Sequence, residues 1–168
     1  EDIKNLIDQP ISIFPFEAKW FKSKNLDVIY AGHPFMDLEH INESTKSFFN
    51  RHSLNINEPI LTLLPGSRQQ EIDKHWPIFL ETVTIIKKKV ENLQTIVGKS
   101  SNITLPDCPE DFRIEKNARK AIIAGTAALA SSGTTNLECV IENTPLVVCY
   151  KLNLPSWFLA KLFVKIKY

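Results

Sequence analysis

Two short glycine loops hold the residues of this chain that could bind a charged ligand. The first is 65–68 (Pro-Gly-Ser-Arg), directly after the apolar run 60–64, and the second is 131–135 (Ser-Ser-Gly-Thr-Thr), directly after 127–130. Each pattern is typical of a strand, a glycine turn and the start of a helix. That arrangement aims backbone N–H groups and the positive end of a helix dipole at one spot, where an anion such as a diphosphate binds well. Two such loops in one small domain predict a nucleotide site.

In the first loop, the candidate phosphate-binding residues are Gly66, Ser67 and Arg68. Ser67 has the side chain of a good helix N-cap, and Gln70 three residues later would complete a capping box. Arg68 adds a forked cation beside the helix start. A capped helix with a surface arginine would explain the same residues, so both interpretations stay open. The loop matches neither the Walker A pattern nor the GxGxxG dinucleotide pattern.

The second loop offers Ser132, Gly133 and Thr134, whose hydroxyl and N–H groups suit phosphate oxygens. Glu138 lies one turn into the helix that follows, where its carboxylate could accept hydrogen bonds from a ribose diol. Thr135 and Glu138 also have the spacing of a capping box, so a simple helix cap is the alternative.

Histidine and cysteine residues give weaker signals. His33, held in extended geometry by the proline after it, could face a cleft between two domains or fix a linker through hydrogen bonds. His75 is expected to face solvent. The three cysteines lack a C-x-x-C spacing, which predicts free thiols in a reducing compartment and no zinc site: Cys108, Cys139 and Cys149. No acidic or histidine-rich cluster requires a metal, and we expect no cofactor.

Composition limits the class of protein. A chain of 168 residues can bury one good core and part of another, and its 43% hydrophobic content is that of a globular protein. A net charge of +1 disfavours a nucleic-acid-binding domain. The sequence begins without Met and ends in an apolar, lysine-bearing stretch, so we expect it to be part of a longer protein.

Strand and helix patterns alternate from residue 59 onward. This alternation predicts right-handed crossovers and a parallel α/β sheet with helices on both faces. Ligands of such sheets bind beyond the carboxyl ends of the strands, where both loops lie. Within the long helix, Pro77 is expected to open the main segment after a separate first turn. The predicted strands are 60–64, 93–97, 112–115, 127–130 and 145–150, and the predicted helices are 69–89, 116–122 and 134–143.

The upstream part reads as a piece of a second domain. A short strand over 11–16, a helix over 17–23 and a buried strand over 27–31 are followed by Gly-His-Pro. Residues 1–36 are therefore assigned to the end of one domain and 59–168 to another. The polar stretch 37–58 between them is expected to be a connecting helix and linker.

Taken together, the motifs resemble those of one known family. LLPGSRQQEI and SSGTTNLECVIENTPLVVCYK, with FPFE and YAGHPFMD upstream, are similar to the lipid A disaccharide synthases, which are two-domain GT-B glycosyltransferases. The resemblance covers the whole chain in order. It implies that residues 1–36 are the end of the N-terminal, acceptor-side domain and that residues 59–168 belong to the C-terminal UDP-sugar-binding domain. Both domains would be Rossmann-like, an α/β fold with a parallel sheet.

The resemblance also implies a reaction. Members of the family transfer 2,3-diacylglucosamine from its UDP ester to 2,3-diacylglucosamine 1-phosphate with inversion. Glu138 would then hold the ribose, and the general base would lie upstream of Glu1, so this chain would bind the donor without catalysis. The residues implied to meet the donor diphosphate are Gly66, Ser67, Arg68, Ser132, Gly133 and Thr134.

Two rival functions and several partners follow from the same residues. The rivals are another GT-B enzyme, of the UDP-N-acetylglucosamine 2-epimerase or peptidoglycan transferase type, and a noncatalytic nucleotide-sugar-binding domain. Residues 155–168 have an apolar helical face and lysines, which could lie on an anionic membrane or pack on another part of the protein or a second subunit. The expected location is cytoplasmic, peripheral on the inner face of the bacterial inner membrane, with a homodimer of the full-length protein and no nucleic-acid partner.

Overall fold

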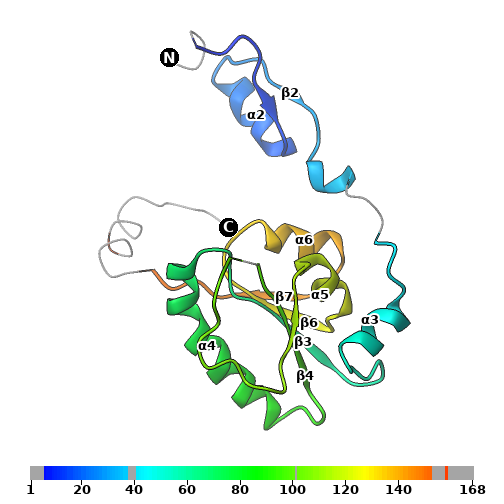
Figure 1. Ribbon diagram of the computed structural model, residues 1–168. Coiled ribbons are helices and arrows are strands. Elements are labelled where there is room, and N and C mark those ends of the chain that lie inside the picture. The colour runs from blue at the N-terminus through cyan, green and yellow to red at the C-terminus, as the bar shows by residue number, and fades with distance from the viewer. Residues whose placement is uncertain (1–5, 38–40, 101, 153–157, 159–168) are drawn as a thin grey trace. The chain divides into compact units, whose positions relative to one another are not determined.

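The computed structural model describes residues 6–37, 41–100, 102–152 and 158. The chain divides into two compact units, Glu1–Ile41 and Asn42–Tyr168 (Figure 1). The expected parallel α/β architecture is confirmed, and both sheets are parallel. The face predicted over 155–168 lies outside the described residues, apart from Phe158.

The described part of the first unit contains a two-stranded parallel sheet, one α-helix and a short 3-10 helix, η1 (Pro34–Asp37). Strand β1 (Ile11–Ser12) pairs with β2 (Ile29–Tyr30), and helix α2 (Pro15–Ser23) connects them. The prediction that the second strand is buried is wrong, because Ile29 and Tyr30 are 54% and 51% exposed. Among the described residues β2 pairs only with β1, so both strands of this small sheet are edge strands.

The second unit is built on a five-stranded parallel sheet. Its strand order is β5-β4-β3-β6-β7, so the chain moves outward from β3 to β5 and then returns to the other side of β3. The order therefore reverses between β3 and β6, and this is where open α/β sheets bind ligands. The strands are β3 (Ile60–Leu64), β4 (Gln94–Gly98), β5 (Arg113–Glu115), β6 (Ala127–Ala130) and β7 (Leu146–Val148).

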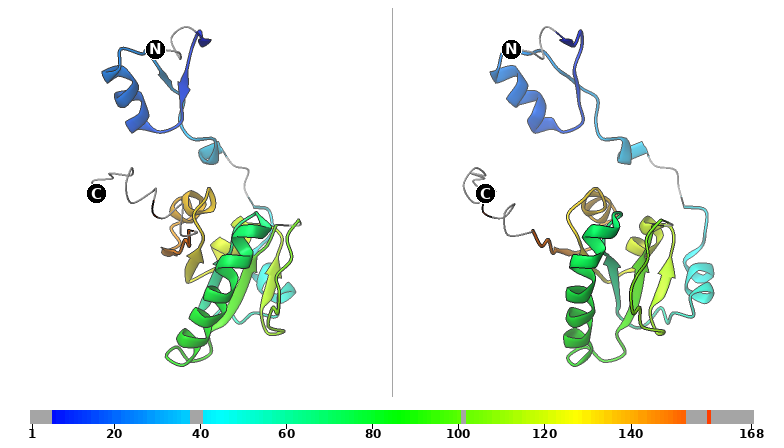
Figure 2. Two further views of the ribbon diagram at one scale, coloured as in Figure 1. Left: turned by 90° about the vertical axis from the view of Figure 1, so that its left-hand side faces the viewer. Right: turned by 60° about the vertical axis from the view of Figure 1, so that its left-hand side comes forward.

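Helices cover both faces of this sheet (Figure 2). Helix α4 (Gln69–Lys87) lies on one face, while α5 (Ala118–Ala124) and α6 (Thr135–Ile141) lie on the other. Successive side chains of β3 point to opposite faces of the sheet. Leu63 packs in the core on the α4 side, and Leu64 packs with Ile122 on the other side.

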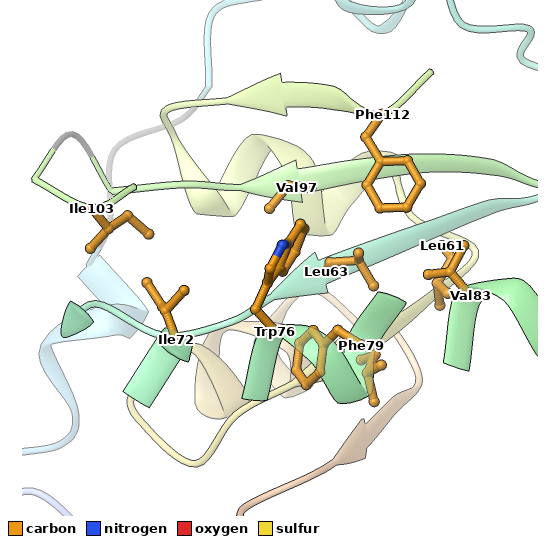
Figure 3. Close-up of a cluster of buried hydrophobic side chains, with 10 residues drawn as sticks. Leu61, Leu63, Ile72, Trp76, Phe79, Val83, Val97, Ile103 and Phe112 are labelled. Carbon is orange, nitrogen blue, oxygen red and sulfur yellow. The ribbon is translucent and has the colours of Figure 1, made fainter. Parts of the chain in front are cut away.

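The α4 face forms the largest core cluster (Figure 3). The spacing of Ile72, Trp76, Phe79, Val83 and Ile86 predicts one buried helical face; the first four are buried, and Ile86 is partly buried against them. The Trp76 Nε1–H donates to the Pro106 carbonyl at 2.7 Å. The prediction that Pro77 separates two helical pieces is wrong, since α4 runs through it. Pro77 is exposed, and the buried side chains before and after it hold the helix together despite the missing N–H.

Helix α3 (Thr45–Arg51) belongs to the second unit. Ser44 Oγ caps it by accepting the Ser47 N–H at 3.2 Å. Phe48 and Phe49 are buried beside β3, β4 and α5 in a core cluster of their own. From Asn42 onward, the stretch expected to be a linker is therefore part of the sheet unit, because two adjacent aromatic side chains anchor it.

A network of charged side chains ties α3 to the end of β5. Buried Glu115 accepts hydrogen bonds from Arg51 Nη2 at 2.8 Å and from the Asn117 N–H at 2.8 Å, and lies 2.9 Å from His52 Nε2. Glu43 pairs with Arg51 and Lys120. Hydrogen bonds from Arg51 and Lys120 lower the pKa of Glu43 from 4.5 to about 2. Burial alone would raise the pKa of Glu115, but its hydrogen bonds outweigh burial and lower it.

This network predicts acid sensitivity of the second unit. A carboxyl whose pKa is lower in the folded than in the unfolded state stabilises the fold above its unfolded pKa, and that stabilisation is lost as the pH falls through the folded pKa. The free energy of unfolding should therefore decrease from about pH 4.5 to about pH 2. Denaturant titrations across this range should show a weaker dependence in Glu43→Gln than in the matched surface variant Glu81→Gln. Equal pH dependence in the two variants would contradict the role of Glu43.

Candidate functional site

A pocket of about 520 Å³ lies at the carboxyl ends of β3 and β6. Both glycine loops line it, and the strand order reverses at this place, as in other open α/β sheets with ligand sites. Its walls are Leu64, Gly66, Ser67, Arg68, Glu71, Gly98, Ser100, Lys116, Ala118, Ser131, Ser132, Gly133, Thr134 and Thr135. The structure thus brings together all six residues expected at the diphosphate.

Gly66 is required by the backbone of the first loop. Its φ is +114°, and a Cβ there would lie 3.1 Å from both the Glu71 Oε2 and the Ser131 Oγ. The Ser131 N–H donates to the Leu64 carbonyl at 2.9 Å, which joins the two loops directly. An L side chain at position 66 would strain the turn and crowd the second loop.

The predicted capping box of Ser67 and Gln70 is wrong. Helix α4 begins at Gln69, its N-cap is Arg68, and no side chain of the described residues caps it. The Gln69 side chain instead exchanges two hydrogen bonds with the Thr104 backbone, at 2.9 and 3.0 Å. This contact with a neighbouring loop sets where the helix starts. The start of α4 therefore carries no side-chain cap from the described residues, and Arg68 and Glu71 at this start line the pocket.

Charged side chains line the first-loop side of the pocket. Arg68 Nη1 donates to Glu71 Oε1 at 2.9 Å, yet its side chain is 79% exposed, so the guanidinium keeps donors for a ligand. Lys116, from the end of β5, adds a second cation. Glu71 and Lys116 were not predicted as site residues, although the rule that ligands bind at the carboxyl ends of strands could have indicated Lys116.

The second loop also lacks its predicted capping box. Helix α6 follows Thr134, whose φ of −63° and ψ of −28° are already helical, and no side-chain cap is found within the described part of the chain. Thr135 is the first residue of α6 rather than its N-cap, so the predicted box of Thr135 and Glu138 does not form. At Gly133, an added Cβ would meet no atom of the described residues within 4 Å. The fold therefore does not require glycine at position 133, and the small residue leaves the pocket open.

Comparison with known proteins identifies the family. The family model described as lipid-A-disaccharide synthetase matches residues 1–168. The chain belongs to this family. It is 36% identical to the lipid-A-disaccharide synthase of Rickettsia akari (strain Hartford), over 97% of the chain and 43% of the relative. It is 30% identical to lipid-A-disaccharide synthase 1 of Legionella pneumophila (strain Lens), over 99% of the chain and 45% of the relative.

A third relative is the lipid-A-disaccharide synthase of Coxiella burnetii (strain CbuK_Q154), which is 29% identical over 99% of the chain and 46% of the relative. The chain therefore spans less than half the length of these curated relatives. The resemblance drawn from the glycine loops is confirmed at the level of the family.

Glu138, the expected ribose ligand, lies in the first turn of α6 and is half-buried. Within the described part of the chain, Glu138 is not one of the residues that line the pocket. Burial raises the pKa of Glu138, the charge of Arg119 opposes this shift and that of Glu142 adds to it. The carboxyl therefore gains a proton at a higher pH than an exposed glutamate does.

His33 and His75 behave differently from each other. His33 Nδ1 accepts the Phe35 N–H at 3.1 Å, and its ring packs against Phe14 and Phe35 within the first unit. These contacts favour the structural alternative for His33. The prediction that His75 faces solvent is wrong, because it is 1% exposed and its Nε2 accepts the Lys151 N–H at 2.9 Å.

The cysteines are free, as predicted. Cys139 is buried in the α6 core, and burial raises the pKa of its thiol to about 11, so it carries little thiolate near neutral pH. Within the described ranges, no three His, Cys, Asp or Glu residues are grouped closely enough to hold a metal ion. Nor does that part of the chain contain a helix long and apolar enough to span a membrane.

Replacing the two loop glycines by alanine should have very different effects on stability. Gly66→Ala should lower the free energy of unfolding by about 1–3 kcal/mol, because alanine is strained at a positive φ. Gly133→Ala, in open space and outside the left-handed region, is the matched control and should change it by less than about 0.5 kcal/mol. Urea titrations measure both values. Equal losses in the two variants would contradict the described loop geometry.

Proposed function

We propose that the protein containing this chain transfers 2,3-diacylglucosamine from its UDP ester to 2,3-diacylglucosamine 1-phosphate with inversion, and that this chain binds the donor. The family membership supports the reaction. The observation that carries the role of this chain is the pocket where both glycine loops meet at the reversal of strand order.

The diphosphate of the donor occupies this pocket in our proposal. Gly66 and Ser67 present backbone N–H groups beside the uncapped start of α4, and Arg68 adds forked donors. From the opposite wall, Ser132, Gly133 and Thr134 contribute hydroxyl and N–H groups. Hydrogen-bond donors from two loops suit a diphosphate, whose oxygens are carried by two phosphorus atoms.

This arrangement would also assist the chemistry. When the sugar leaves UDP, negative charge grows on the diphosphate while the sugar carbon becomes oxocarbenium-like. Arg68 and the fixed N–H groups of α4 stabilise that charge more strongly in the transition state than in the ground state. The chain's own groups thus activate the leaving group, and we propose that no metal or other cofactor is needed.

Glu138 is proposed to hold the ribose hydroxyls through its carboxylate. Because burial raises its pKa, donor affinity should begin to fall at a higher pH than it would with an ordinary glutamate at this position. Calorimetry with UDP-N-acetylglucosamine tests this, since its diphosphate is a diester and has no ionisation near pH 6. Glu138→Gln should bind more weakly at pH 7 and lose the pH dependence. An unchanged pH profile in this variant would exclude Glu138 as the titrating group.

The acceptor and the base that deprotonates it are assigned to the part of the protein upstream of Glu1. This chain alone is therefore expected to bind the donor without transferring it. Acylated substrates suit an enzyme that is peripheral on the inner face of the inner membrane, and we extend the proposal to that location. The homodimer of the full-length protein stays a prediction.

Assaying the full-length protein tests the reaction. Purified enzyme with both acylated substrates should release UDP and form the disaccharide, detected by mass spectrometry, and Arg68→Ala should lower the rate about 100-fold through weaker charge stabilisation. The matched control is Arg113→Ala, which removes an arginine that does not line the pocket. Donor binding without any transfer would instead favour a noncatalytic nucleotide-sugar-binding protein.

A further inference from the structure

A second pocket, of about 170 Å³, lies beside the first and shares Arg68 and Glu71 with it. Gln70, Lys74 and His75 of α4 form one side, and Tyr150 and Lys151, just after β7, form the other. Two segments far apart in the sequence thus converge here. The proposed donor site does not use Lys74 or Lys151.

The second pocket carries excess positive charge. Arg68, Lys74 and Lys151 line it together with a single carboxylate, Glu71, which is already paired with Arg68. Neither lysine takes part in an ion pair with another described residue. Cations gathered without counter-charges attract an anion.

His75 fixes one wall of the pocket. Burial lowers the pKa of His75, so its ring is neutral near pH 7, and the Lys151 N–H bonds to its Nε2. The proton of the neutral ring is then on Nδ1, which is buried and has no hydrogen-bond partner among the described residues. The ring also packs against Tyr150, with centroids 5.0 Å apart. These contacts hold Lys151 beside α4.

We propose that this pocket is a second anion site that binds a phosphate monoester, distinct from the diphosphate site. The Lys74 and Lys151 ammonium groups and the Gln70 amide supply donors from both walls. The volume suits one phosphate and a small substituent, whereas the first pocket is about three times larger. The monoester can belong to a soluble metabolite or to a lipid headgroup, since both present the same dianion.

Calorimetry with glycerol 3-phosphate in saturating UDP tests this proposal, because UDP keeps the probe out of the first pocket. Lys74→Ala/Lys151→Ala should weaken the probe about tenfold or more. Lys46→Ala/Lys89→Ala removes the same charge from exposed positions outside the pocket and should change the affinity less than twofold. UDP affinity, measured separately, should be equal in all three proteins, so a failure of the donor site is recognised on its own.

A second arm uses vesicles of phosphatidylcholine with and without phosphatidic acid, whose headgroup is the lipid form of the same monoester. Lysine-dependent binding of the soluble probe supports a metabolite, and lysine-dependent binding to the phosphatidic acid vesicles alone supports a lipid. Absence of binding to both probes, or binding that does not depend on Lys74 and Lys151, would overturn the proposal. So would displacement of glycerol 3-phosphate by UDP.

Discussion

Replacing Gly133 by valine is expected to weaken UDP binding about 100-fold while leaving the free energy of unfolding nearly unchanged. The side chain would enter space that the described residues leave empty, on the pocket wall assigned to the diphosphate. Losing two hydrogen bonds to a charged group costs about 3 kcal/mol, which corresponds to roughly a 100-fold change in affinity. Calorimetric titration with UDP measures the affinity.

The control for this variant lies on the same helix. Val140→Ala changes an exposed residue of α6 that does not line the pocket, so UDP affinity should be retained. If Gly133→Val binds UDP as tightly as the parent chain, the diphosphate does not lie against the second loop, and the assignment of Ser132, Gly133 and Thr134 is wrong.

Trp76→Ala should cause the largest loss of stability, about 3–5 kcal/mol. The indole is 1% exposed within the α4 core, and its N–H bonds to the Pro106 carbonyl. The variant leaves both a cavity and an unpaired carbonyl. Guanidinium titrations followed by circular dichroism measure the change in the free energy of unfolding.

Ile85→Ala is the matched control, because Ile85 is on the same helix and 49% exposed. It should cost less than about 1 kcal/mol. Trp76→Phe separates the cost of the cavity from the cost of the unpaired carbonyl, since phenylalanine fills most of the cavity but cannot donate a hydrogen bond to Pro106. A loss in Trp76→Ala no larger than that in Ile85→Ala would show that α4 does not pack on the sheet as described.

The strands and the long helix could be predicted because their signals are local. The apolar runs 60–64 and 127–130 end at glycine loops, and the observed strands have the same bounds. The stripe from Ile72 to Val83 repeats every three or four residues, which places α4 on the sheet. Burial of His75 could have been predicted too, because it lies three residues after Ile72 on the buried face.

Other features depend on contacts that a local pattern does not contain. Both capping boxes failed because a helix start can shift by a residue or two, and at α4 the pairing of Gln69 with Thr104, 35 residues away, sets it. The rule for strand ends places Lys116 at the ligand-binding edge of the sheet, but its approach to this pocket also depends on strand order, which no single segment reveals. The burial of Phe48 and Phe49 likewise became visible only once β3, β4 and α5 were in place.

The central claim is that the two glycine loops bind the diphosphate of a UDP-sugar, and amide chemical shifts test it most directly. In ¹⁵N-labelled chain titrated with UDP, the largest shifts should fall on residues 66–68 and 132–134, with smaller ones near Glu138. Uridine, which lacks the diphosphate, should leave the loop amides nearly unchanged. Saturable shifts at both loops would support the account. Shifts confined to other surfaces, or none in a folded chain, would contradict it.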